Sequence, residues 1–127
     1  MSKIIGIGGI FLHFKGDEKE VMKWYSNVFE MKMSEYGTSF IEGEQLALLS
    51  FKRSSDDAPF INFRVDDIEG AVESVKNSNG TVHTEIEDYP YGKFAQINDP
   101  FGNRVELWEP VVEYYKKMVN EEVDVYK

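Results

Sequence analysis

The sequence predicts an α+β fold in a single domain, in which a β-α-β-β-β order of elements occurs twice and one helix follows. The first observation is length, because 127 residues suffice for one hydrophobic core but not for two independent ones. The second is a weak internal repeat, in which Gly9 aligns with Phe60 and Trp24 with Val75. The third is that no Pro-, Gly- or Ser-rich linker divides the chain. We expect module one over about 4–53, module two over about 58–110 and a terminal helix over about 110–121.

The first half opens with an apolar pattern, GGIFLHF, that predicts a strand over Gly8–Phe14. A helix is expected within DEKEVMKWYSNVF, where four apolar residues recur at helical spacing. These residues are Val21, Trp24, Tyr25 and Val28. Asp17 followed by Glu20 resembles a capping box at the start of this helix. Short strands are expected after the helix, over Met31–Tyr36, Ser39–Glu42 and Gln45–Phe51.

The second half repeats this order, with PFINFRV over Pro59–Val65 as a strand and DDIEGAVESVKNSNG as a helix. The helix presents an apolar face made of Ile68, Ala71, Val72 and Val75. Asp66 or Asp67 is expected to cap its start, and Gly80 to supply the left-handed residue that ends it. The segments TVHTEIE, KFAQIN and NRVELW follow as strands, joined by the turns YPYG and DPFG.

The segment VVEYYKKMVNEEV after Pro110 carries an apolar stripe at helical spacing. The stripe consists of Val111, Val112, Tyr115, Met118 and Val119. We expect a further amphipathic helix, whose stripe covers either its own domain or a second subunit.

Alternation along the predicted strands divides their side chains between two faces of a sheet. One face is apolar and suits the helices, whereas the other combines aromatic rings with a few polar groups. The second face collects Phe11, His13, Phe60, Asn62, Arg64, Phe94, Gln96, Arg104, Glu106 and Trp108. This mixture is typical of a small-ligand pocket. A half-solvated sheet, or one whose aromatic residues cover a partner, produces the same alternation, so both interpretations stay open.

Composition excludes several classes of function. The formal charge of −9 argues against a nucleic-acid binder, which relies on clustered Lys and Arg. The apolar runs are too short to cross a membrane, and the first residues lack the pattern of a signal peptide, so a cytoplasmic protein is expected. The absence of Cys excludes disulfides, thiolate metal sites and a cysteine nucleophile. The chain also has no GxSxG turn or P-loop.

Three segments in order resemble the vicinal oxygen chelate superfamily, which includes glyoxalase, bleomycin-resistance, fosfomycin-resistance and extradiol dioxygenase proteins. They are GGIFLHFKGDEKEVMKWYSNVF, FINFRVDDIEGAVESVKNSNGTV and INDPFGNRVELWEP, and the resemblance covers Ile4–Pro110. It implies two βαβββ modules that pair edge to edge, so that a curled mixed sheet surrounds a cavity. It also implies a homodimer.

The resemblance further implies four metal-ligand positions, which fall on Gly9, Ala47, Phe60 and Glu106. Only Glu106 offers a donor atom, whereas a divalent ion needs about three protein donors. We therefore expect no metal or other cofactor, and Glu106 is a metal ligand only if His13 or a partner subunit completes the set. A structural role, with Glu106 paired to Arg64 or Arg104, stays open.

The preferred function is metal-free binding of a small, partly aromatic molecule, similar to the bleomycin-resistance branch. The aromatic residues would stack on the ligand, while Asn62, Arg64 and Gln96 would orient it. The acidic surface favours a cationic ligand. One alternative is a lyase, isomerase or dioxygenase that uses Glu106, or a metal-free enzyme with Glu106 as general base and His13 as proton partner. A second alternative is a non-catalytic interaction module.

Overall fold

The structure is a computed structural model, and it describes residues 2, 9–35, 39, 50–51, 55 and 58–124. The chain forms two compact units, Met1–Ala58 and Pro59–Lys127. In the first unit lies α1 (Glu18–Phe29). The second unit contains β1 (Asn62–Arg64), α2 (Ile68–Asn77), β2 (Thr81–Tyr89), β3 (Gly92–Asn98), β4 (Arg104–Pro110) and α3 (Val112–Asp124). The expectation of a single domain over the whole chain stays a prediction.

Helix α1 forms where its apolar spacing predicts it, and the residues expected on its inner face are buried. They are Val21, Trp24, Tyr25 and Val28. Asp17 caps the helix, because its side chain accepts a hydrogen bond of 3.1 Å from the backbone N–H of Glu20. The helix ends at Glu30, which adopts the left-handed conformation with a φ of 54°.

The strand expected over Gly8–Phe14 is not formed in its described part, residues 9–14. A strand requires a hydrogen-bonded neighbour as well as an apolar pattern, and none of the described residues pairs with this segment. Ile10, Phe11 and Leu12 are all exposed, so the expected alternation of buried and exposed positions is also wrong here. Phe14 instead packs against Tyr25 of α1, with ring centroids 5.5 Å apart.

The strand expected over Met31–Tyr36 is not formed in its described part, residues 31–35, apart from a single bridge. Met33 and Ser39 form an isolated antiparallel bridge. The rest of the segments expected over Ser39–Glu42 and Gln45–Phe51 lies outside the described residues, apart from Ser50 and Phe51.

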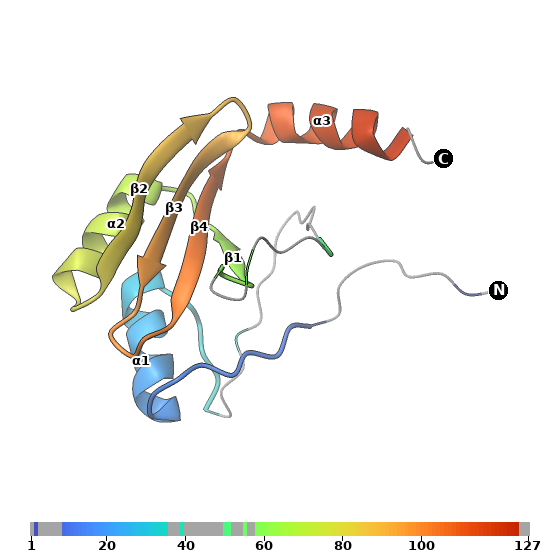
Figure 1. The fold of residues 1–127 in the computed structure, drawn as a ribbon. Coiled ribbons are helices and arrows are strands. Elements are labelled where there is room, and N and C mark those ends of the chain that lie inside the picture. Colours follow the sequence, from blue (N-terminus) through green and yellow to red (C-terminus); the bar gives the residue numbers. More distant parts are fainter. Residues whose placement is uncertain are drawn as a thin grey trace. The chain divides into compact units, whose positions relative to one another are not determined.

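The second unit is built on a four-stranded mixed sheet in the order β1-β4-β3-β2 (Figure 1). Strands β1 and β4 pair in parallel, whereas β4, β3 and β2 form antiparallel pairs. Strand β1 is shorter than the expected Pro59–Val65, because its ladder extends only from Asn62 opposite Glu106 to Arg64 opposite Trp108. The sheet is open. This arrangement confirms the α+β class, the mixed sheet and the β-α-β-β-β order of the second half.

Helix α2 lies along one face of this sheet and contacts β2, β3 and β4 (Figure 1). The interior between them is apolar: it consists of Ile68, Val72 and Val75 from the helix and Ala95, Ile97, Val105 and Leu107 from the sheet. The alternation predicted for β3 and β4 is therefore confirmed. Burial of each large aliphatic side chain contributes about 1.5–3 kcal/mol, so this layer is the main source of stability in the unit.

Side chains at the start of α2 fix the helix to the sheet. Asp67 is the N-cap, and its Oδ1 accepts from the backbone N–H of Gly70 at 3.2 Å. The backbone N–H of Ile68 donates to Glu109 of β4 at 3.0 Å. Lys93 of β3 forms a 3.1 Å salt bridge with Glu69, which raises the pKa of Lys93.

The end of α2 corrects one expectation about glycine. Asn79, with a φ of 66°, is the left-handed residue, and Gly80 is not. Gly80 is needed for a different reason, since a Cβ there would lie 3.0 Å from the carbonyl oxygen of Asn98.

Strand β2 contains two irregularities in its pairing with β3. Val82 pairs with Ile97, Thr84 with Gln96 and Glu87 with Phe94, so the register shifts twice. Each shift inserts one residue into β2, as in a β-bulge. As a result Thr84, rather than His83, lies opposite Gln96, and His83 is exposed.

The DPFG turn between β3 and β4 is organised by the buried carboxylate of Asp99. Its Oδ1 accepts hydrogen bonds of 2.9 Å from the backbone N–H groups of both Phe101 and Asn103. Its Oδ2 accepts a third bond of 2.8 Å from the side chain of Asn103. The turn is therefore held by one side chain that satisfies three donors.

We expect Asp99→Ala to lower the free energy of unfolding by about 1–3 kcal/mol, because it leaves buried donors without an acceptor. Urea unfolding followed by far-UV circular dichroism measures the change. The matched control is Asp88→Ala on β2, where the residue is exposed and a change within about 0.5 kcal/mol is expected. Equal stability of the two variants would contradict this role for Asp99.

Helix α3 follows directly from β4, as the apolar stripe predicts (Figure 1). Tyr115 is buried, and its ring meets the ring of Trp108 edge to face, with centroids 4.7 Å apart. This part of the stripe therefore covers its own unit, while Val111 and Val112 remain exposed. Across the described parts of the chain, none of the helices has the length and apolar character needed to cross a bilayer.

Candidate functional site

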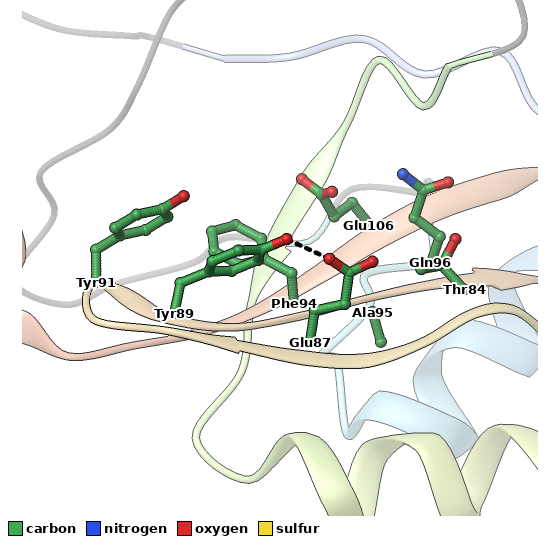
Figure 2. Close-up of a pocket in the computed structure, with 8 residues that line it drawn as sticks. All are labelled: Thr84, Glu87, Tyr89, Tyr91, Phe94, Ala95, Gln96 and Glu106. Carbon is green, nitrogen blue, oxygen red and sulfur yellow. Dashed lines mark hydrogen bonds between the residues drawn. The ribbon is translucent and has the colours of Figure 1, made fainter.

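A groove of about 300 Å³ lies on the second unit, over β2, β3 and β4 (Figure 2). It is lined by Thr84, Glu87, Tyr89, Tyr91, Phe94, Ala95, Gln96 and Glu106. Phe94, Gln96 and Glu106 alternate with the residues that face α2, so the groove occupies the opposite face of the sheet. The face that the alternation set aside for a ligand is thus concave in the structure.

Aromatic rings form the end of the groove near the β2–β3 turn. The rings of Tyr89 and Tyr91 are stacked with centroids 5.5 Å apart, and each meets Phe94 at a steep angle. Phe94 in turn stacks on Trp108, with centroids 5.7 Å apart and 9° between the ring planes. Trp108 donates a 3.2 Å hydrogen bond to the carbonyl of Tyr91, and Tyr115 packs on it from α3. The aromatic end of the groove is therefore part of a packed cluster of rings.

The polar part of the groove contains two carboxylates. Glu106 Oε1 accepts a 2.8 Å hydrogen bond from the side-chain amide of Asn62, which is its register partner on β1. The carboxylate of Glu87 accepts a hydrogen bond from the hydroxyl of Tyr89 (Figure 2). This bond and the charge of Glu87 raise the pKa of the Tyr89 phenol.

The residues predicted for the ligand face fall into three groups. Phe94, Gln96 and Glu106 line the groove. Asn62 and Trp108 lie beside it on the same face of the sheet, where they contact their cross-strand partners Glu106 and Phe94.

The third group lies away from the groove lining. The guanidinium of Arg64 lies 5.5 Å from the centre of the Trp108 ring, and Arg104 donates to Asn98 at 3.0 Å. Phe60 is exposed. Phe11 and His13 are exposed and belong to the other compact unit.

Five lining residues were missed by the sequence analysis, namely Thr84, Glu87, Tyr89, Tyr91 and Ala95. Simple alternation could not place Thr84, because the bulges in β2 change which residues face the groove. The signal for the tyrosines was the sequence YPYG, which predicts a turn but also carries two rings to the end of the hairpin.

The four metal-ligand positions implied by the resemblance do not hold a fitting set of donors. Gly9 has no side chain, Phe60 has no donor atom, and Ala47, which also lacks one, lies outside the described residues. Glu106 alone supplies an oxygen, and a divalent ion needs about three protein ligands. These residues do not fit a metal of the kind that the resemblance implies.

A separate acidic group, Asp67, Glu69 and Glu109, lies at the start of α2. Each of its carboxylates already has a partner, as described above: Asp67 accepts from the backbone N–H of Gly70, Glu69 pairs with Lys93, and Glu109 accepts from the backbone N–H of Ile68. The group thus attaches α2 to the sheet and lies on the face away from the groove.

Comparison with known proteins identifies the family. The family model of the Glyoxalase/Bleomycin resistance protein/Dioxygenase superfamily matches residues 11–107, more than half of the chain. The chain is similar to the crystal structure of a superfamily member from Sphaerobacter thermophilus, with a TM-score of 0.53 and 18% identity over 81% of this chain and 99% of that one. A hypothetical protein from S. aureus matches with a TM-score of 0.49 and 16% identity, over 82% of this chain and 95% of that one. None of the curated proteins compared with the chain matches it. The extent of the family match shows that this chain belongs to the Glyoxalase/Bleomycin resistance protein/Dioxygenase superfamily.

Proposed function

We propose that this chain binds a small organic molecule in the groove on the face of the sheet opposite α2. The observation that carries the proposal is a concavity of about 300 Å³ that combines aromatic rings with hydrogen-bonding groups. Known small-molecule sites begin at about this volume, and the present groove has a larger polar share in its lining than most of them. Superfamily membership alone does not name a ligand, because one fold supports many functions.

The aromatic end of the groove is suited to stacking on a flat ligand. Phe94 is held between its neighbours and the ring of Trp108, which is itself buried. Binding therefore does not have to order these side chains from a mobile state, and the entropy cost of association is reduced. The polar groups at the other end, among them Gln96 and Thr84, provide both donors and acceptors that orient a ligand.

The proposal involves no metal, because the donor set at the expected ligand positions does not fit one. Glu106 acts here as a hydrogen-bond acceptor and a negative charge in the wall of the groove. The enzymatic alternative stays a prediction, since His13 and Glu106 belong to different compact units. The interaction-module alternative, the homodimer and the cytoplasmic location also stay predictions.

Thermal unfolding in the presence of small aromatic compounds tests the proposal, because a ligand that binds only the folded state raises the Tm. We expect Tyr91→Ala to weaken the binding of such a ligand about threefold to tenfold, because the loss of one aromatic contact costs about 0.5–1.5 kcal/mol. The matched control is Tyr114→Ala, which removes an exposed ring from α3. A ligand whose shift in Tm is the same in both variants binds elsewhere, and that result would overturn the proposal.

A further inference from the structure

We infer that the ligand of this groove is an organic cation with a flat apolar part, such as an aryl-substituted ammonium. Its charged group lies between Glu87 and Glu106, and its apolar part lies against Tyr91 and Phe94. This inference rests on the proposed function and names the class of ligand.

The charge of the groove is the first argument. Glu87 and Glu106 both line it, and none of its described lining residues is basic. Arg64, over the indole of Trp108, and Arg104, which donates to Asn98, keep their positive charges but do not line the groove. Lys93 is paired with Glu69 on the α2 side of the sheet. The local field therefore favours a cation and opposes an anion.

The hydrogen bonds of the two carboxylates are the second argument. The donors are the amide of Asn62 and the hydroxyl of Tyr89, both of which are neutral. Neither bond compensates the negative charge. A carboxylate offers about four acceptor positions on its two oxygens, so each glutamate can still accept from a ligand.

The arrangement of the strands is the third argument. Glu87 is on β2 and Glu106 is on β4, and β3 lies between these strands in the sheet. The two strands are thus separated by two strand spacings, roughly 10 Å, and the pairing also offsets Glu106 from Glu87 by two residues along the strands, roughly 7 Å. Each side chain covers part of that separation. Figure 2 shows both carboxylates on the same face of the sheet, with the rings of Tyr91 and Phe94 toward the hairpin end. One ammonium group and one flat group can therefore be accommodated at once.

Three probes of similar size and different charge test the inference: phenethylammonium, 2-phenylethanol and 3-phenylpropanoate. Binding to the full chain is measured by NMR titration, with the indole N–H of Trp108 as reporter. We expect the cation to bind about tenfold more tightly than the alcohol, and the anion more weakly than both. Added salt is expected to weaken the binding of the cation but not that of the alcohol.

Charge-removing variants locate the effect. We expect Glu87→Gln and Glu106→Gln each to weaken the binding of phenethylammonium about threefold to tenfold. The affinity for 2-phenylethanol should not change. The control is Glu73→Gln, which removes one exposed negative charge from α2 and leaves the groove intact. Circular dichroism confirms that each variant is folded.

The possible outcomes separate the inference from the proposed function. If cation and alcohol bind equally well, or if the anion binds best, the inference is overturned while a ligand groove remains. If Glu73→Gln weakens the cation as much as the groove variants do, only the overall charge attracts it, and the inference is again wrong. If none of the probes perturbs Trp108, both the inference and the proposed groove are rejected.

Discussion

Trp108→Ala is expected to lower the free energy of unfolding by about 3–5 kcal/mol, as is typical of removing a large aromatic side chain from a core. Trp108 is buried, stacks on Phe94 and packs against Tyr115 of α3. Its indole N–H also donates to the carbonyl of Tyr91. The substitution therefore removes the ring that packs beside Phe94, the contact with α3 and one hydrogen bond to the hairpin. Chemical unfolding measures the loss of stability. Loss of a ligand-induced shift in Tm measures the effect on the groove.

Two further variants separate these contributions. Trp108→Phe keeps a ring beside Phe94 but loses the hydrogen bond, so we expect a smaller loss of about 1 kcal/mol. Tyr115→Ala removes the α3 contact and leaves the stack of Phe94 on Trp108 in place, so ligand-induced stabilisation should persist. If Trp108→Ala left both stability and ligand binding unchanged, the face of β4 assigned to the groove would be wrong.

Gly92→Ala is the second substitution with a large expected effect. Gly92 begins β3 with a φ of 139°, a conformation that residues other than glycine rarely adopt. A Cβ there would collide with the indole nitrogen of Trp108 and lie 2.6 Å from the carbonyl oxygen of Glu109. Backbone strain and overpacking each cost about 1–3 kcal/mol, so the combined loss is about 3 kcal/mol or more.

Gly9→Ala is the matched control, because a Cβ at Gly9 meets no atom of the described residues within 4 Å beyond its chain neighbours. The same exchange of glycine for alanine is expected to change stability by less than about 1 kcal/mol there. Differential scanning calorimetry of the two variants beside the parent chain provides the comparison. A Gly92→Ala variant as stable as Gly9→Ala would show that the chain around Trp108 can move apart at little cost.

The second half of the fold was predictable because its helix and its strands carry matching apolar faces. Val72 and Val75 repeat at helical spacing, while Val105 and Leu107 repeat at strand spacing, and all four are buried. Each pattern has only one way to turn its apolar side toward the other. The same argument placed Phe94, Gln96 and Glu106 on the opposite face, but it left open whether that face forms a groove or a solvated surface.

Other parts of the structure depend on features that alternation does not encode. The two bulges in β2 bring Thr84 to the groove, and no residue type in TVHTEIE marks where they occur. The left-handed residue is Asn79 and not Gly80. Both residue types tolerate this conformation, so the sequence alone does not decide between them. In the segment 9–14, Ile10 and Phe11 have the composition of a strand, but pairing depends on a neighbour that local sequence does not specify.

The bulges also affect how the sheet ends. Strand β2 is the last in the order of the sheet and is nine residues long, a length at which an evenly spaced edge can recruit a strand from another molecule. Its irregular register breaks that spacing, and the charges of Glu85 and Asp88 are exposed along it. The same distortion that shapes the groove thus makes this border a poor template for fibril-like growth.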